Sequence, residues 1–317
     1  MPSEITPAKI TRSDAVKVNG VIYNDPKKNK NISAIDQIGD RLLVGADEGG
    51  KIKVLEWQAD QSYQAIYGIE LGDREIDIEG ITSEGDTVYV IGSHSYKREK
   101  VDPADAYVKN QTAIAQTTLD PERDQLFRFR LGPDPKIDQI SLRDVLENDE
   151  ILSLFCQIPS KENGVDIEGI AVREQQLYIG FRGPVLRGNW VPVLRCEFQE
   201  PLKRASRLWV NLGGRGIRDL TRVDDGFLIL AGPVGDGLGG YQVYFWDGAD
   251  CLPGERSAGQ PALGQLQCLG DVAIVEGHKP EGITIVEETA QFYQAIIVVD
   301  GSVNGDPHYW QIAKAST

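Results

Sequence analysis

Three short segments of the chain place an acid and a glycine ahead of a strand-like run. The segment "DIEGI" spans Asp77–Ile81 and returns at Asp166–Ile170, and a relative, "PEGIT", spans Pro280–Thr284. Carboxylates held close together raise one another's pKa unless a positive charge lies among them, and a hard cation such as calcium accepts several oxygen ligands. The segments therefore indicate a candidate calcium site, formed by the glutamates Glu79, Glu168 and Glu281.

Two further segments carry other residues at the position of this glutamate. The equivalent residue is Ser33 in "NISAID" and Arg218 in "GIRDL". Arg218 and Lys279 can neutralise the glutamates as an internal network of ion pairs, which requires no metal. A bound cation and an ion-pair network both remain open as interpretations.

The aspartate and glycine residues next to the glutamate have structural explanations. Gly80, Gly169 and Gly282 fit places where backbones crowd together, or where a strand needs an unusual dihedral angle. Asp77 and Asp166 can cap backbone amides in turns. On this interpretation, only the glutamate of each segment takes part in chemistry.

A second group of candidate residues ends the strand that follows each segment. His94 in "GSHS" can act as a general acid or base, since an unperturbed histidine titrates near ~6.5, or it is a loop histidine bonded to its flanking serines. Arg182 in "FRGP" can clamp a carboxylate or phosphate, or pair with Asp219 or Glu168. The equivalent positions in the other segments are Asp47, Glu48, Pro233 and Asp300.

These assignments define the predicted site. The candidate catalytic residues are His94, Glu79 and Glu168. The candidate ligand-binding residues are Arg182, Arg218, Lys279 and Asp219. In an antiparallel pair the start of the first strand and the end of the second lie on the same side, so we expect both groups to share one mouth.

The elements that position these residues follow from internal repetition. Units begin at residues 31, 77, 166, 216 and 279, and each alternates apolar runs with polar turns as antiparallel strands do. A repeat of about 40–50 residues is typical of a four-stranded propeller blade. We predict third strands at Lys51–Trp57, Gln125–Leu131, Val191–Phe198 and Tyr241–Trp246, and a helix at Leu142–Asn148.

The predicted fold is all-β, a single β-propeller of five blades that covers residues 1–317 as one domain. A sixth blade hidden between residues 77 and 166 is the alternative. Insertions are expected at about residues 96–124 and 248–270, where the polar and Gly/Pro-rich stretches lie. Strands within Val16–Asn24 and His308–Ala313 would close the ring, since a propeller joins its ends to protect its edges.

Composition limits the partners. The formal net charge is −15, with no basic tract to release counterions, so neither nucleic acid nor an anionic membrane is an expected partner. The chain shows no apolar run typical of a targeting segment or membrane span, and we expect a cytoplasmic monomer. Cys156 and Cys196 read as buried thiols, whereas spacing leaves open whether Cys251 and Cys268 pair.

Taken together, the motifs "DIEGI", "YVIGSHS", "FRGPV", "GIRDL", "DDGFLILAGPVGD" and "PEGIT" resemble a bacterial group of β-propellers of unknown function. The resemblance covers roughly residues 30–310 in blade order. It implies a propeller with a funnel at one face, and it implies no activity. The chain is also distantly similar to the phytase-like and SdiA-regulated propeller groups, and propellers of this kind include calcium-binding hydrolases.

Two functions follow as hypotheses. In the first, an acid-rich funnel binds a small anionic or sugar-like ligand through the arginines, with calcium as the candidate cofactor, and hydrolyses an ester or phosphoester by metal-activated water. In the second, the funnel is a structural ion-pair network, and the chain is a protein-interaction platform whose insertion at 96–124 contacts a partner. The sequence leaves open whether the protein is an enzyme.

Overall fold

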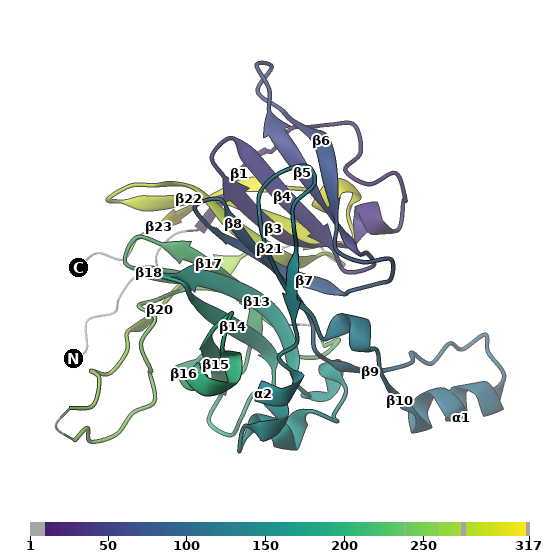
Figure 1. Cartoon of the computed structure of the whole chain (residues 1–317), viewed down its shortest axis with the longest axis vertical. Helices are drawn as coiled ribbons and strands as arrows, with labels where there is room; N and C mark the ends of the chain where they lie inside the picture. The colour runs from purple at the N-terminus through teal and green to yellow at the C-terminus, as the bar shows by residue number, and fades with distance from the viewer. Residues whose placement is uncertain (1–9, 238, 258, 274–276, 315–317) are drawn as a thin grey trace.

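Five β-sheets surround a common axis in the computed structural model, which describes residues 10–237, 239–257, 259–273 and 277–314 (Figure 1). Each sheet contributes its innermost strand to a ring in which every strand lies against the next and the last returns to the first. This arrangement confirms the five-bladed propeller and excludes the sixth blade. The inner strands are β3 (Ile32–Ile38), β7 (Ile78–Glu84), β13 (Asp166–Arg173), β17 (Gly216–Val223) and β21 (Lys279–Glu288).

Each blade adds outer strands that run antiparallel to their neighbours. Blade 1 adds β4 (Arg41–Ala46), β5 (Lys51–Trp57), β6 (Tyr63–Glu70) and, parallel to β6, the two-residue β2 (Val18–Asn19). Blade 2 adds β8 (Thr87–Gly92), β11 (Leu126–Arg130) and β12 (Asp138–Ile140). Blade 3 adds β14 (Gln176–Gly183), β15 (Trp190–Glu197) and β16 (Ser206–Asn211). Blade 4 adds β18 (Gly226–Gly232), β19 (Tyr241–Trp246) and β20 (Leu266–Val272).

Blade 5 combines the two ends of the described chain. It adds β22 (Phe292–Asp300), β23 (His308–Ala313) and, as its outermost strand, β1 (Ile10–Ala15). Ring closure is therefore confirmed, but the expected N-terminal strand within Val16–Asn24 is wrong, because that segment contributes only β2. An edge strand with a single partner needs no apolar alternation, so the polar sequence of β1 gave no strand signal. The prediction of no N-terminal targeting segment rests partly on residues 1–9, which lie outside the described residues.

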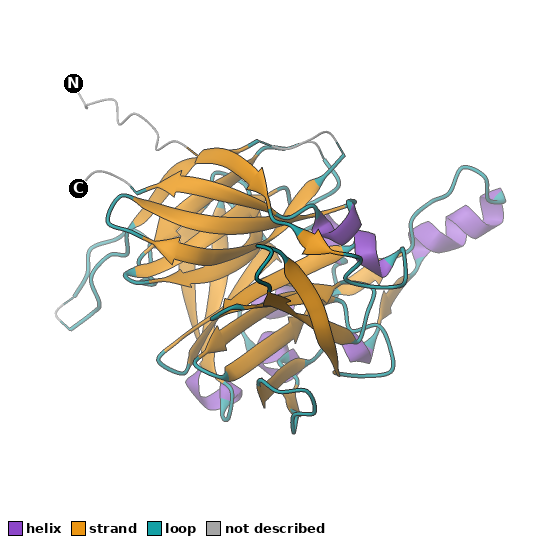
Figure 2. Cartoon of the chain, turned by 90° about the horizontal axis from the view of Figure 1, so that it is seen from above, coloured by secondary structure: helices purple, strands orange, loops and turns teal. Residues whose placement is uncertain are grey.

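The insertion after blade 2's second strand forms an arm that projects from the body (Figures 1 and 2). The arm consists of β9 (Tyr96–Arg98), α1 (Tyr107–Ala115) and β10 (Thr117–Leu119), with β9 and β10 paired. No residue of α1 is buried. No helix among the described residues is long and apolar enough to cross a bilayer. The 3-10 turns of the chain are Lys28–Lys30, Pro121–Arg123, Leu152–Phe155, Ser160–Glu162 and Val303–Gly305.

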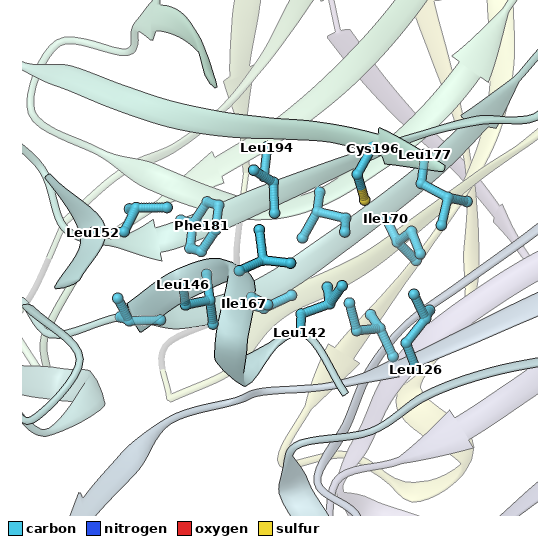
Figure 3. Packing of buried hydrophobic residues seen from close by; sticks show 14 of the residues in the cluster. Leu126, Leu142, Leu146, Leu152, Ile167, Ile170, Leu177, Phe181, Leu194 and Cys196 are labelled. Atoms are coloured by element: carbon cyan, nitrogen blue, oxygen red, sulfur yellow. The ribbon is translucent and has the colours of Figure 1, made fainter. Parts of the chain in front are cut away.

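The second helical segment fills the junction between blades 2 and 3. Helix α2 (Arg143–Asn148) confirms the predicted helix, and Leu142 and Leu146 pack against Ile167 and Phe181 of blade 3 (Figure 3). Burying one such side chain stabilises a fold by about 1.5–3 kcal/mol. The third helix of the described residues, α3, is a single turn at Pro201–Arg204. Cys156 and Cys196 are buried, as expected. The structure contains no disulfide among the described residues, Cys251 and Cys268 included.

All five inner strands share one irregularity. Their pairing with the second strand of the blade slips by one position, which leaves one residue of the inner strand with no partner opposite. A β-bulge of this kind re-aims the side chain that it carries. The five bulged residues are Ser33, Glu79, Glu168, Arg218 and Glu281. The position that recurs in the sequence is thus a recurring bulge at the axis.

The glycine after the bulge packs against the next inner strand of the ring. A β carbon on Gly169 would lie 2.9 Å from the backbone nitrogen of Leu220, and one on Gly80 would lie 3.2 Å from the backbone nitrogen of Ile170. Gly282 meets the backbone of β3 in the same way. Crowding, one of the two explanations expected for these glycines, is therefore confirmed.

Gly169→Ala is expected to lower the free energy of unfolding by about 1–3 kcal/mol, because the new carbon meets backbone atoms that cannot rotate away. Gly132→Ala is the matched control, since nothing lies within 4 Å of its added carbon. Its effect should stay within about 0.5 kcal/mol. Urea unfolding followed by circular dichroism measures both variants, and equal stabilities would contradict the crowding account.

Candidate functional site

A cavity of about 470 Å³ opens on the propeller axis, at the end where the bulges lie. We divide the charged residues of its lining into a floor, whose residues are buried or half-buried, and a rim, whose residues are half-buried or exposed. The floor consists of Asp47, Asp77, Glu79, Arg123, Asp166, Glu168, Arg182, Glu281 and Asp300. The rim consists of Lys97, Arg98, Glu99, Lys100, Lys161, Glu162, Asp236 and Lys279. The cavity therefore brings bulged residues of the inner strands together with residues that end second strands.

An arginine-centred network neutralises part of the floor. Arg218 lies directly beneath it and bonds Glu168 Oε2 through Nη1 at 2.8 Å and Glu281 through Nη2. Arg182 Nη1 bonds the second oxygen of Glu168 at 2.7 Å, and its Nη2 bonds Asp166. Burial raises the pKa of Glu168 to about 8, although the two guanidinium groups oppose that rise. Glu168 is thus fully engaged by two arginines.

The pairing of Arg182 with Glu168 has a local cause. Asp166 pairs with Gly183 and Ile167 with Phe181, so Arg182 has no partner opposite on β13. Glu168 is the bulged residue of β13 in turn. Two bulges on facing strands therefore aim an arginine and a glutamate at the same space.

The aspartates that precede the bulges belong to the floor as well. Asp166 bonds Arg182, and Asp77 Oδ2 accepts a bond from Arg123 Nη1 at 2.6 Å. Asp77 also has a backbone φ of 59°, which turns its side chain away from the regular strand. The interpretation of Asp77 and Asp166 as caps of turn amides is therefore wrong, because both carboxylates pair with buried arginines instead.

Two acids of the floor are left over. Asp300 Oδ2 lies 3.5 Å from Lys279 Nζ, which leaves Asp47 and Glu79 as floor acids without an ion pair among the described residues. The Oδ1 atom of Asp47 is buried and has no hydrogen-bond partner in the described part of the chain. In the described part of the chain the seven acids of the floor are therefore matched by four cations, Arg123, Arg182, Arg218 and Lys279. The two acids that pair with none of them are Asp47 on blade 1 and Glu79 on blade 2.

The electrostatics of these two acids follow from their neighbours. Burial, followed by the charges of Asp77 and Glu281, raises the pKa of Asp47 to about 8. Burial, followed by the charges of Glu168 and Asp77, raises the pKa of Glu79 well above its usual range. At neutral pH both acids therefore tend to hold a proton that an exposed carboxyl would release.

Two of the three glutamates that were predicted to bind calcium are paired with arginines instead. Both oxygens of Glu168 and one oxygen of Glu281 are bonded to arginines, so only Glu79 of the three glutamates is free to act as a ligand. In the described part of the chain, no group of three or more acidic, histidine or cysteine side chains is arranged to hold a metal ion. Calcium binding by the three glutamates stays a prediction, and it requires Arg218 to release two of them.

His94 is far from the expected role. Its ring is fully buried, with Nδ1 donating to the Gly92 carbonyl at 2.9 Å and Nε2 accepting from the Leu142 amide at 3.1 Å. Burial lowers the pKa of His94 to about 4, so the ring is neutral. Both sequence interpretations put His94 in an exposed loop or at the mouth, and the structure places it in neither. It ties the end of β8 to the segment that leads into α2.

Asp219 is also outside the cavity. It takes the position of the glycine after the bulge in blade 4. Its carboxylate accepts the backbone N–H of Leu220 at 2.7 Å and that of Ile283, on the next inner strand, at 2.7 Å. Asp219 therefore joins blades 4 and 5, and Arg182 pairs with Asp166 and Glu168 instead. Ser33 acts likewise, because its hydroxyl donates to the Ile78 carbonyl of blade 2.

Sequence reasoning missed Arg123 and the roles of Asp77 and Asp166 as floor acids. Arg123 comes from the segment after the arm, which has no counterpart in other blades, so repetition gave no signal for it. The ends of second strands did provide a signal for Asp47 and Asp300, since both were aligned with Arg182.

Comparison with known proteins supports the fold. No curated protein matches the chain in sequence. Glutaminyl cyclase from Myxococcus xanthus has a similar structure, with a TM-score of 0.52 and 11% identity over 97% of both chains. An exo-β-1,3-galactanase from Phanerochaete chrysosporium with β-1,3-galactotriose has a TM-score of 0.47 and 8% identity, over 96% of this chain and 64% of its own. At 11% identity the likeness to the cyclase concerns the fold alone.

A family comparison adds an assignment by sequence. The family described as "Protein of unknown function (DUF3616)" matches residues 31–141 and 135–307. The matched residues include all five inner strands and the cavity floor. Since they span most of the sequence, the chain belongs to this family.

Proposed function

We propose that the axial cavity binds a small ligand through a cationic group, an amine or a guanidinium, held by Asp47 and Glu79. One observation carries the proposal: every other acid of the floor has a basic partner, whereas these two have none among the described residues. A volume of about 470 Å³ is within the range of small-molecule sites.

The floor carries more acidic than basic groups, and this imbalance favours a cationic ligand. In the free protein, holding a proton relieves the repulsion that Asp47 and Glu79 each experience from the acids around them. A bound cation lets both carboxyls ionise and gains their attraction in a partly buried site, where charges interact more strongly than in water. Binding should therefore release protons.

Other ligand classes find less support at the floor. An anionic ligand, expected from the sequence, would need Arg182 or Arg218, and both guanidinium groups are already bonded to carboxylates. A sugar-like ligand could hydrogen-bond to Asp47 and Glu79 but would leave in place the repulsion that each experiences from neighbouring acids such as Asp77. The placement of His94 also gives no support to hydrolysis with that ring as acid or base.

The interaction platform remains a second candidate because of one feature, the arm. All of α1 lacks buried residues, and Tyr107, Val108 and Ile114 are large apolar side chains exposed to solvent. An isolated helix of this length is marginal in water, so a partner that covers it would stabilise it. This function needs the arm and makes no use of Asp47 or Glu79.

The contribution of Asp47 to stability should fall as pH rises from about 4 through 8, because folded Asp47 keeps a proton that the unfolded chain has lost. Asp47→Asn removes this penalty. We expect the free energy of unfolding of this variant to exceed that of the wild type by about 1–3 kcal/mol at pH 9, and to differ little from it at pH 5.

Denaturant unfolding at a series of pH values measures this effect. Asp47 faces Asp77, Glu281, Asp300 and Glu48, and none of these changes in the variant. Exposed Asp134→Asn is the control, and its pH dependence should follow that of the wild type. A parallel pH dependence for Asp47→Asn would contradict the unbalanced acid.

Isothermal titration calorimetry with butylamine and methylguanidine tests the proposal itself. We expect saturable binding with proton release, and a rise in Kd of about tenfold or more in Glu79→Gln, equivalent to ~1.4 kcal/mol. Glu174→Gln, in an exposed turn between β13 and β14, is the control and should bind as the wild type does.

The same titration distinguishes the alternatives. The proposal would be overturned if calcium chloride, phosphate or glucose bound while butylamine and methylguanidine did not. The probe that bound would then identify the competing ligand class. Silence of every probe would overturn it as well and would favour the interaction platform.

A further inference from the structure

We infer that the ligand of this cavity is a zwitterion, with its cationic group on the floor and a carboxylate or phosphate group held by the lysines of the rim. The inference deepens the proposed function and rests on it. Its own basis is the rim, which the cationic-group proposal does not use.

The rim has the opposite charge balance to the floor. Of its eight residues, Lys97, Arg98, Lys100, Lys161 and Lys279 are basic, and Glu99, Glu162 and Asp236 are acidic. Arg98 is committed to Glu162, which it holds with two nitrogens. Among the described residues, Lys97 and Lys100 have no ion pair. The cavity is therefore negative at depth and positive at its opening.

Three rim lysines gather around a single acid. Lys161 Nζ lies 3.3 Å from Asp236 Oδ1. Partial burial raises the pKa of Asp236, but Lys161, Lys279 and Lys100 together hold that pKa below its usual range. Lys279 also pairs with Asp300, so Asp236 faces Lys161 and Lys100 alone. One carboxylate cannot neutralise both ammonium groups, so this part of the rim retains net positive charge.

These lysines can reach a ligand. The side chains of Lys161 and Lys279 are 51% and 46% exposed, so their ammonium groups lie in water at the ends of flexible stems. Each is held by only one acid, at more than 3 Å. An anionic group at the opening can therefore recruit them without breaking a buried pair.

The two layers select by charge. A simple amine would be attracted by the floor and repelled by the rim, and a simple anion would meet the reverse. A molecule with a positive and a negative group at its two ends satisfies both layers, and its orientation in the cavity is fixed. An amino carboxylate and an amino phosphate share this chemistry.

Calorimetry with matched ligands tests the inference. The set comprises butylamine, butyrate, the ω-amino carboxylates from glycine to 6-aminohexanoate, and ethanolamine paired with phosphoethanolamine. We expect at least one zwitterion to bind about tenfold more tightly than the amine of the same length, while butyrate binds weakly. The phosphate pair shows which anionic group the rim prefers, and the length series reports the separation of the two layers.

A rim variant assigns the effect to the lysines. In Lys100→Gln/Lys161→Gln the advantage of the zwitterion over its amine should fall to about twofold or less, while butylamine binds as well as before or more tightly. Exposed Lys136→Gln is the control and should keep the full advantage. Circular dichroism and the melting temperature verify that each variant is folded.

The outcomes separate the two proposals. Equal affinity of amine and zwitterion in the wild type, or an advantage that survives Lys100→Gln/Lys161→Gln, would overturn the zwitterion and leave the cationic site standing. Failure of both butylamine and methylguanidine to bind, or binding that is indifferent to Glu79→Gln, would overturn the cationic site and the zwitterion with it.

Discussion

The axial site depends on a single guanidinium group, that of Arg218. Five bulges aim five side chains at one axis, and three of these are glutamates, so the ring would repel itself if nothing positive lay within it. Arg218 replaces a fourth glutamate and bonds both Glu168 and Glu281, which come from the blades on either side of its own. Removing one partner of a buried ion pair typically costs about 3–5 kcal/mol, which makes this contact a structural requirement as well as a charge balance.

The same contact explains why the floor is asymmetric. Blade 4 adjoins blades 3 and 5, so Arg218 reaches their glutamates and not Glu79, which comes from blade 2. Arg123 compensates Asp77 nearby, and no cation compensates Glu79 or Asp47 in the described part of the chain. Charge left uncompensated in a cavity is typical of binding sites, because a ligand can supply the missing partner. A network of ion pairs that serves stability alone does not require acids without a basic partner.

The sequence was sufficient for the architecture because every blade repeats the same strand, bulge and crowded glycine. The predicted strands Lys51–Trp57 and Tyr241–Trp246 agree with β5 and β19 residue for residue. Features without a repeat were missed. His94 lies in a polar run whose burial depends on α2, a contact distant in sequence. Arg123 has no counterpart in other blades, and which glutamate an arginine reaches depends on blade neighbours rather than on spacing.

The account predicts that the cavity holds acids that are protonated where ordinary carboxyls are not. Carboxyl carbon-13 NMR titration of the wild type, assigned with Asp47→Asn and Glu79→Gln, measures this directly. We predict that Asp47 titrates near pH 8 and that Glu79 titrates well above exposed glutamates. Titration of both Asp47 and Glu79 near ~4, as in model peptides, would contradict it.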